Sequence, residues 1–182
     1  TIVIGFFNTV IPNTITRIGD KAFKYSKGLT SIVIPDSVTE IGKNVFSECY
    51  RLTSIRVSSG NKNYDSRNDC NAIIETETNT LLTGCQNTII PDSVTSIGYG
   101  AFAHCSGLTF IEIPDSVTTI RKSAFLFCSN LTSIVIPDSV TTIEINAFNG
   151  CNTLKTIYVP ENKTNYFKKL LPYDLHEYIV EK

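Results

Sequence analysis

The 23-residue repeat is the feature of this sequence that most restricts its fold. The pentapeptide PDSVT occurs at residues 35–39, 91–95, 114–118 and 137–141, with PNTIT at residues 12–16 as a looser copy. Successive repeat prolines are 23 residues apart, except that Pro35 and Pro91 are separated by one repeat plus a further 33 residues. A fixed period of this length is typical of solenoids, in which each coil is too small to bury its own core and stacks on its neighbours.

One coil, residues 29–49 (LTSIVIPDSVTEIGKNVFSEC), indicates the role of each position. The β-branched stretch at residues 32–34 predicts a short strand that ends at Pro35. The sequence Pro-Asp-Ser is typical of a tight turn, because proline presets φ and the aspartate side chain can bond the backbone ahead. A second short strand is expected at residues 38–41, and a corner at Gly42 then leads into a single helical or 3-10 turn.

Stacking would bring each apolar position against its own counterpart one coil away. We therefore expect an internal column of phenylalanines with a column of small residues beside it. The phenylalanines are Phe23, Phe46, Phe102, Phe125 and Phe148, and the small residues are Ala22, Ala101, Ala124 and Ala147, with Val45 as the exception. The predicted fold is a right-handed, β-rich β/α superhelix of 23-residue coils, with short parallel strands and short helical or 3-10 turns.

The chain is predicted to be one solenoid domain, residues 1–182, with four parts. Residues 1–57 are repeats preceded by a partial insertion unit, 58–90 an irregular β insertion, 91–159 regular repeats and 160–182 a C-terminal cap. The partial unit is inferred because TIVIGFFNTVIP at residues 1–12 aligns without gaps on TLLTGCQNTIIP at 80–91, and we expect further repeats before it. The cap contains a helix-like segment at 164–171, ended by Pro172, which would cover the last apolar layer.

Composition excludes several classes of protein. Charged residues make up 18% of the chain and the net charge is −1, whereas a nucleic-acid-binding protein normally shows a basic excess. No run of 18 apolar residues exists, so no membrane span is predicted. The first residues lack the charged region and cleavage site of a signal peptide. Because it contains no methionine, the chain is expected to be a processed or excised piece.

The repeat pattern LxxIxIPxSVTxIGxxAFxxC resembles the BspA-like branch of the leucine-rich repeats, a family of bacterial and protist surface proteins. The resemblance covers every coil from Pro12 to about Pro160. It implies a leucine-rich-repeat solenoid, a cell-surface or secreted location, and attachment to host or cell-surface proteins. One departure from ordinary leucine-rich repeats is serine in place of their asparagine or cysteine ladder, at Ser37, Ser93, Ser116 and Ser139.

Four of the six cysteines belong to the repeat. Cys49, Cys105, Cys128 and Cys151 each follow a repeat proline by 14 residues, and Ser26 has the same place in the first coil. Such a slot indicates buried free thiols, which pack as small hydrophobic side chains. A disulfide between Cys70 and Cys85, both inside the insertion, is the alternative. No zinc site is predicted, because no CxxC or HxxxH spacing exists and His104 and His176 are far apart.

The sequence predicts no catalytic residue and no cofactor. It contains no GxSxG, no glycine-rich phosphate loop and no HExxH motif. The recurring aspartates, Asp36, Asp92, Asp115 and Asp138, are interpreted as turn residues. His104 precedes Cys105, but adjacent residues in a turn point apart and Glu48 and Phe127 replace this histidine in other coils.

The outward positions of the first strand of each coil form the candidate binding face. The third-position row reads Ser31, Ser54, Phe110, Ser133 and Thr156, and the fifth-position row reads Val33, Arg56, Glu112, Val135 and Tyr158. Arg56, Phe110, Glu112 and Tyr158 depart from the small residues around them, and aromatic residues and arginine are common at interface hot spots. The alternative is ordinary drift on an exposed face.

The insertion offers a second candidate patch, with Tyr64, Asp65, Arg67 and Asp69 on or near a loop. The alternative is a bulge held by its own hydrogen bonds. Two functions follow from the sequence and the resemblance. The first is a non-enzymatic module for protein binding or for adhesion to host or other cells. The second is a structural spacer with no ligand of its own, for which bland serine and threonine rows would suffice.

Overall fold

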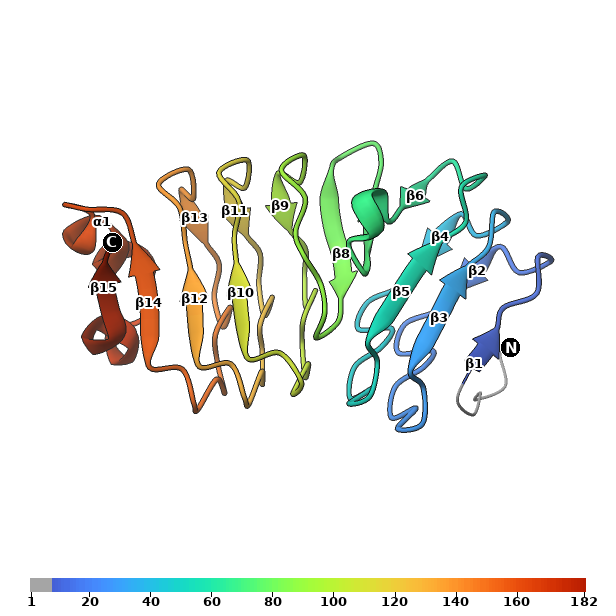
Figure 1. Cartoon of the computed structure of the whole chain (residues 1–182), viewed down its shortest axis with the longest axis horizontal. Coiled ribbons are helices and arrows are strands. Elements are labelled where there is room, and N and C mark those ends of the chain that lie inside the picture. Colours follow the sequence, from blue (N-terminus) through green and yellow to red (C-terminus); the bar gives the residue numbers. More distant parts are fainter. Residues whose placement is uncertain (1–7) are drawn as a thin grey trace.

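The computed structural model describes residues 8–182, which form an elongated stack of coils along one axis (Figure 1). The first strands of the coils make two parallel sheets. One contains β1 (Asn8–Val10), β3 (Ser31–Ile34) and β5 (Ser54–Val57), and the other contains β10 (Phe110–Glu112), β12 (Ser133–Val135), β14 (Thr156–Val159) and β15 (Ile179–Glu181). The solenoid predicted from the repeat is confirmed.

Strand register follows the repeat. Ile32 pairs with Ile55, and Ile134 pairs with both Ile111 and Ile157, so equivalent positions of successive coils lie side by side. These isoleucines are buried and the residues on either side of them point outward, which is the period-2 alternation of a strand with one covered face. The two outward rows predicted from the sequence therefore run across the sheets in register.

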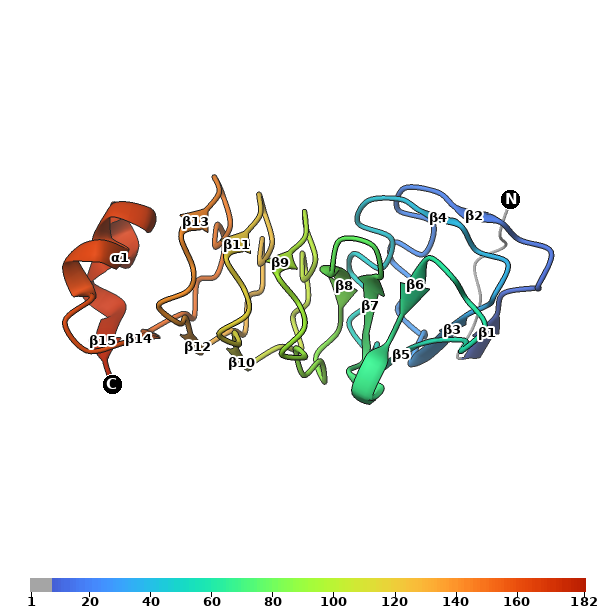
Figure 2. The same cartoon turned by 90° about the horizontal axis from the view of Figure 1, so that it is seen from above.

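The second strands of the coils form a separate row, seen from above in Figure 2 on the side opposite β10, β12 and β14. In the N-terminal half, β2 (Arg17–Ile18) pairs with β4 (Glu40–Ile41). In the C-terminal half, β13 (Thr142–Ile143), β11 (Thr119–Ile120) and β9 (Ser96–Ile97) continue into β8 (Thr80–Gly84), β7 (Ala72–Glu75) and β6 (Tyr64–Asp65). The insertion thus supplies antiparallel strands β6 to β8, and β8 joins the repeats by parallel pairing with β9.

The segment expected to be a helical or 3-10 turn is instead a run of tight turns. Two residues of each such segment have positive φ, for example Ser123 at 59° and Phe127 at 54°. A residue with positive φ has a left-handed backbone conformation and cannot continue a right-handed helix. Alternate N–H groups therefore point to the next coil instead of to a carbonyl of their own coil. The Phe102 N–H, for example, donates to the Ala124 carbonyl of the next coil at 2.7 Å. These segments form a third ladder between coils.

Side-chain ladders explain the serines and cysteines of the repeat. The hydroxyls of Ser37, Ser116 and Ser139 donate to backbone carbonyls of the preceding coil at 2.7 to 2.9 Å. The thiols of Cys49, Cys128 and Cys151 lie 3.0 to 3.1 Å from a phenylalanine carbonyl of the preceding coil. All six cysteines are free thiols, including Cys70 and Cys85, and five of the six are buried. The expected buried slot is confirmed.

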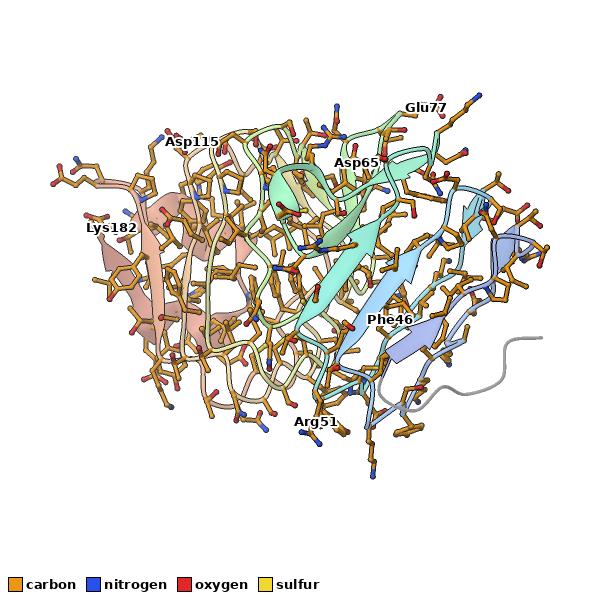
Figure 3. All side chains as sticks on the ribbon, turned by 45° about the vertical axis from the view of Figure 1, so that its right-hand side comes forward. Phe46, Arg51, Asp65, Glu77, Asp115 and Lys182 are labelled. Carbon is orange, nitrogen blue, oxygen red and sulfur yellow. The ribbon has the colours of Figure 1, made fainter. Side chains whose placement is uncertain are left out.

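The phenylalanine column is broken into two stacks, which corrects the single column expected from the sequence. The rings of Phe23 and Phe46 stack at 5.3 Å, and Phe125 stacks on Phe102 at 5.1 Å and on Phe148 at 5.4 Å. Side chains fill the interior of the coils (Figure 3), but the buried apolar residues divide into two clusters, one in each half. The reason is the insertion: the backbone of Gly84 in β8 lies against the Phe102 ring, where a further phenylalanine would otherwise stack.

The C-terminal segment covers the last coil. Helix α1 (Thr164–Leu170) buries Phe167 and the 3-10 segment η2 (Tyr173–Tyr178) buries Leu175, both in the C-terminal cluster. The chain then returns as β15, which extends the parallel sheet by pairing with β14. Within residues 8–182, no helix is both long enough and apolar enough to cross a membrane.

Candidate functional site

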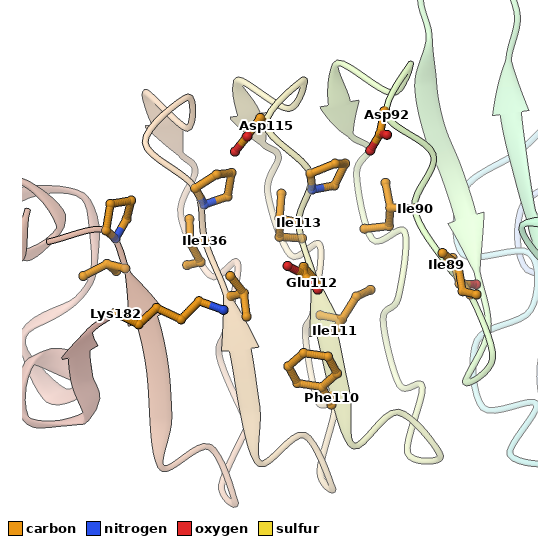
Figure 4. A pocket seen from close by; sticks show the side chains of 16 residues that line it. Ile89, Ile90, Asp92, Phe110, Ile111, Glu112, Ile113, Asp115, Ile136 and Lys182 are labelled. Atoms are coloured by element: carbon orange, nitrogen blue, oxygen red, sulfur yellow. The ribbon is translucent and has the colours of Figure 1, made fainter.

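A groove of about 650 Å³ lies on the outer face of the C-terminal sheet (Figure 4). Its lining comes from the segment at residues 88–92, from β10 and the turn after it, from β12, and from the chain end after β15. In Figure 4, Asp92 and Asp115 lie at the upper side of the groove, Phe110 at the lower side and Glu112 between them. This arrangement places an acidic wall opposite an apolar one.

Strand β10 positions two of the predicted residues in this groove. Ile111 is buried beneath the sheet, so the alternation of the strand turns Phe110 and Glu112 outward. The Phe110 side chain remains 49% exposed, because its in-register neighbour on β12 is the small Ser133. The structure thus brings Phe110 and Glu112 together, as the outward rows predicted.

Tyr158 lies on the same face, two strands from β10. It pairs in register with Val135, which in turn pairs with Glu112, and Val135 is only 8% exposed between these larger side chains. The ammonium group of Lys182 lies 5.3 Å from the centre of the Tyr158 ring. The Lys182 N–H also donates to the Val159 carbonyl at 3.0 Å, so the chain end is held beside the groove.

Ile89 is an exposed groove residue that the sequence analysis missed. Its side chain is 77% exposed, and its N–H donates to the Cys70 carbonyl at 3.1 Å. The alignment of residues 80–91 on residues 1–12 contained the signal, because it matches Ile89 with Val10, which pairs with Val33 in the fifth-position row. Lys182 could not have been found in this way, since it lies outside the repeats.

Three carboxylates of the groove have no hydrogen bond or ion pair with any described residue: Asp92, Asp115 and Glu112. Asp138, at the same repeat position as the two aspartates, instead makes an ion pair with Lys163 at 2.8 Å. Asp92 and Asp115 lie in turns, as interpreted from the sequence, but neither side chain bonds the turn backbone. Both side chains are exposed and remain available to a ligand.

Arg56 lies apart from this groove. It is on β5 in the N-terminal sheet, in register with Val33, and its guanidinium is 3.8 Å from the Asp69 carboxylate of the insertion. Both side chains are largely exposed, so this pair adds little to stability. Asp69 belongs to the short 3-10 segment η1 (Arg67–Asp69).

The patch predicted on the insertion is occupied by structural contacts, and Tyr64 and Arg67 are removed from the candidate surface. Tyr64 is 6% exposed, packs in the N-terminal cluster, and donates its hydroxyl to the Thr39 carbonyl at 3.2 Å. The Arg67 guanidinium bonds both oxygens of Asp65, at 2.6 to 3.1 Å, and reaches Asn79 at 2.9 Å. The alternative of a bulge held by its own hydrogen bonds describes this segment.

A second groove, of about 490 Å³, occupies the corresponding place on the N-terminal sheet. Its lining includes Val10, Val33, Pro35 and Asp36, which are the repeat counterparts of residues in the larger groove. Among residues 8–182, only one carboxylate lines it, that of Asp36. The two grooves therefore share a shape derived from the repeat but differ in charge.

The adjacent His104 and Cys105 show no sign of an activated nucleophile. The His104 ring lies against Phe127, with 5.1 Å between ring centres, and burial lowers the pKa of His104. Burial raises the pKa of the Cys105 thiol to about 12, so this thiol stays protonated near neutral pH. Among residues 8–182, no group of three or more His, Cys, Asp or Glu side chains is arranged to hold a metal ion.

Comparison with known proteins identifies the family. Residues 5–83 and 79–172 match the model of the BspA type leucine rich repeat region, in six copies. A leucine-rich repeat protein from Eubacterium ventriosum matches with a TM-score of 0.70 and 30% identity over 85% of this chain. One from Bacteroides ovatus matches with a TM-score of 0.59 and 28% identity over 98% of it.

The pneumococcal vaccine antigen PcpA, at 17% identity over 84% of this chain and 50% of its own, shares the fold with a TM-score of 0.59. The search of curated proteins gave no match. The chain spans 42% of the length of each of the Eubacterium and Bacteroides proteins. Because the family model covers nearly all of its sequence, the chain belongs to the BspA-type leucine-rich repeat family.

Proposed function

We propose that this chain is a non-enzymatic protein-binding module of a cell-surface or secreted protein, and that it attaches to host or cell-surface proteins. The contact is made by the outer face of the C-terminal sheet, around Phe110 and Tyr158. The single observation that carries the proposal is Phe110, a large aromatic side chain left half exposed at the edge of a groove. Membership of a family of surface repeat proteins supports the location.

Packing does not explain the residues at this face. A solenoid coil needs its inward isoleucines and phenylalanines, while its outward positions accept small polar residues such as Ser31 and Ser54. Phe110 and Ile89 place apolar surface in water without covering any core, which is a cost unless a partner covers them. Aromatic side chains are common among the anchor residues of protein interfaces.

The alternative is a spacer that holds another domain away from the cell. The third-position row supports it, because Ser31, Ser54, Ser133 and Thr156 are small and polar on most coils. A spacer needs rigidity and solubility but no anchor residue. The two functions therefore make different predictions: a binding module needs Phe110 and Tyr158 for attachment, and a spacer does not.

A double variant, Phe110→Ala with Tyr158→Ala, separates the two functions. Beads coated with the wild-type chain are expected to attach to cultured epithelial cells or to immobilised extracellular-matrix proteins, and the double variant is expected to lose most of this attachment. Its melting temperature should stay close to wild type, because both side chains lie outside the core. Val33→Ala, at an outward position of the N-terminal sheet, is the matched control and should attach normally.

Two results would contradict the proposal. Equal attachment by the wild type and the double variant would show that this face makes no contact. Attachment of wild-type beads no better than that of uncoated beads, for every surface tried, would favour the spacer.

A further inference from the structure

We propose that the C-terminal groove binds an extended peptide segment in which basic and apolar side chains alternate. The inference rests on the proposed function, because it specifies the chemistry of the partner segment that the same face contacts. Two observations support it. One wall of the groove is acidic and the other is apolar, and the N-terminal groove lacks this combination.

The lower wall of the groove is apolar and open. Phe110 and Ile89 are the exposed large hydrophobic side chains in the groove lining, at 49% and 77% exposure. Phe110 lies at the lower side, and Ile89 lies level with Glu112 at the end of the groove beside β8 (Figure 4). An aliphatic side chain placed against this wall would remove apolar area from water on both partners. This wall favours a ligand with leucine-like side chains along one edge.

The upper wall is acidic and lacks internal partners. Asp92 and Asp115 occupy the same position in adjacent coils, and Glu112 lies between them and Phe110 (Figure 4). None of the three carboxylates forms an ion pair with a described residue, so a basic ligand would not have to displace an existing cation. A ligand with lysine or arginine side chains along its other edge would be complementary to this wall.

The one basic residue of the groove lies at its opposite end. Lys182 is held against the Tyr158 ring, on the far side of β12 from Asp92 and Asp115. A basic ligand would therefore place its cations toward β10 and avoid the chain end. The charges at the two ends of the groove therefore favour one placement of the ligand, with its cations at the β10 end.

The dimensions suit an extended chain that crosses the strands. Neighbouring strands are about 4.8 Å apart, so the path from the segment at residues 88–92 across β10 and β12 to β14, all of which line the groove, spans about 14 Å. At about 3.3 Å per residue, four to five extended residues cover this length. Successive side chains of such a segment point to opposite sides, so alternating basic and apolar residues would face the acidic and apolar walls respectively.

The N-terminal groove provides an internal comparison. Among the described residues it repeats the same backbone positions, but it has Asp36 as its one carboxylate, Ser31 in place of Phe110 and Val33 in place of Glu112. The neighbouring outward position on β5 is Arg56, a cation. A basic peptide is therefore expected to choose the C-terminal groove, and Asp36 and Val33 serve as matched control positions.

The test uses fluorescein-labelled hexapeptides and fluorescence anisotropy with the whole chain. Acetyl-LKLKLK is expected to bind, acetyl-LELELE not to bind, and acetyl-SKSKSK to bind about tenfold more weakly, since it lacks the apolar edge. The variant Glu112→Gln with Asp115→Asn should weaken LKLKLK about tenfold, as should Phe110→Ala. Asp36→Asn and Val33→Ala should leave its affinity unchanged. Raising the salt concentration should weaken binding of LKLKLK.

The outcomes separate this inference from the proposed function. Equal binding of LKLKLK and LELELE, absence of LKLKLK binding, or equal effects of the groove and control variants would overturn the peptide chemistry. Bead attachment that still depends on Phe110 and Tyr158 would leave the proposed function standing in that case. Peptide binding that behaves as expected, together with bead attachment that is indifferent to these residues, would instead overturn the proposed function.

Discussion

The central phenylalanine of the C-terminal stack gives the sharpest test of the fold. Phe125 is fully buried, and its ring has a nearly parallel ring on each side, Phe102 at 5.1 Å and Phe148 at 5.4 Å. The change Phe125→Ala would leave a cavity between two coils that cannot approach each other, because their strands are fixed by backbone hydrogen bonds. The site has little freedom to relax.

The expected cost follows from this geometry. Replacing a buried phenylalanine by alanine costs about 3–5 kcal/mol. Each stacked aromatic pair contributes about 0.5–1.5 kcal/mol beyond burial, and Phe125→Ala removes two of them. We therefore expect a value in the upper half of the range, about 4–5 kcal/mol, which is comparable with the whole stability of many domains.

Urea unfolding followed by circular dichroism and tyrosine fluorescence measures this cost, since the chain has eight tyrosines and no tryptophan. The matched control is Phe127→Ala, two residues away in the same turn segment. Phe127 is 47% exposed and contacts His104 rather than a core ring, so its loss should cost about 1 kcal/mol. The difference between the two variants cancels effects common to any loss of phenylalanine.

A difference of less than about 1.5 kcal/mol between the two variants would refute the reasoning. It would mean that the coils collapse around the missing ring, or that Phe125 does not lie between its counterparts. A solenoid can also unfold in parts, so the transition is compared for the two halves by hydrogen exchange. Loss of protection confined to the C-terminal cluster is the expected pattern.

Three further predictions concern the insertion and the buried thiols. Gly84→Ala should cost about 1–3 kcal/mol in urea unfolding, because the new Cβ would overlap the Phe102 ring, whereas Gly19→Ala meets no atom and should be tolerated; equal costs would contradict this. Burial raises the pKa of Cys49 from 9.0 to about 11, so the folded state keeps a proton that the unfolded chain loses. Stability should therefore be complete below about pH 9 and fall toward pH 11, less steeply in Cys49→Ala, and an identical slope in that variant would refute the assignment. Arg67→Lys should lower the melting temperature through a loss of about 1–2 kcal/mol, because an ammonium group cannot reproduce the planar set of hydrogen bonds; an unchanged melting temperature would show that these bonds do not hold the insertion.

Much of the coil was predictable because its information is local. The strand at residues 31–34, the turn after Pro35 and the inward isoleucines follow from period-2 alternation and turn chemistry within one repeat. The cap helix followed from the end of the repeat pattern and from Pro172. The turn segment was misjudged as helical, because its positive-φ residues, such as Ser123, are unusual choices for that conformation.

The candidate site was predictable only in part. Phe110, Glu112 and Tyr158 stood out as departures within outward rows, and the structure places them on one face. Tyr64 looked equally available in the sequence, yet it is buried in the core of the N-terminal half. A polar-looking loop does not reveal which of its side chains turn inward, since that depends on contacts with other coils.

By itself the repeat determined the stacking, the register and the identity of the inward and outward rows, because identical coils pack best when each position meets its own copy. Only the tertiary structure decided where the stack is interrupted and where the groove lies. Gly84 meets Phe102, and Lys182 lines one groove with Phe110, although these residues are not repeat counterparts. Contacts between unlike positions carry no period in the sequence, so they emerge only when the whole chain is packed.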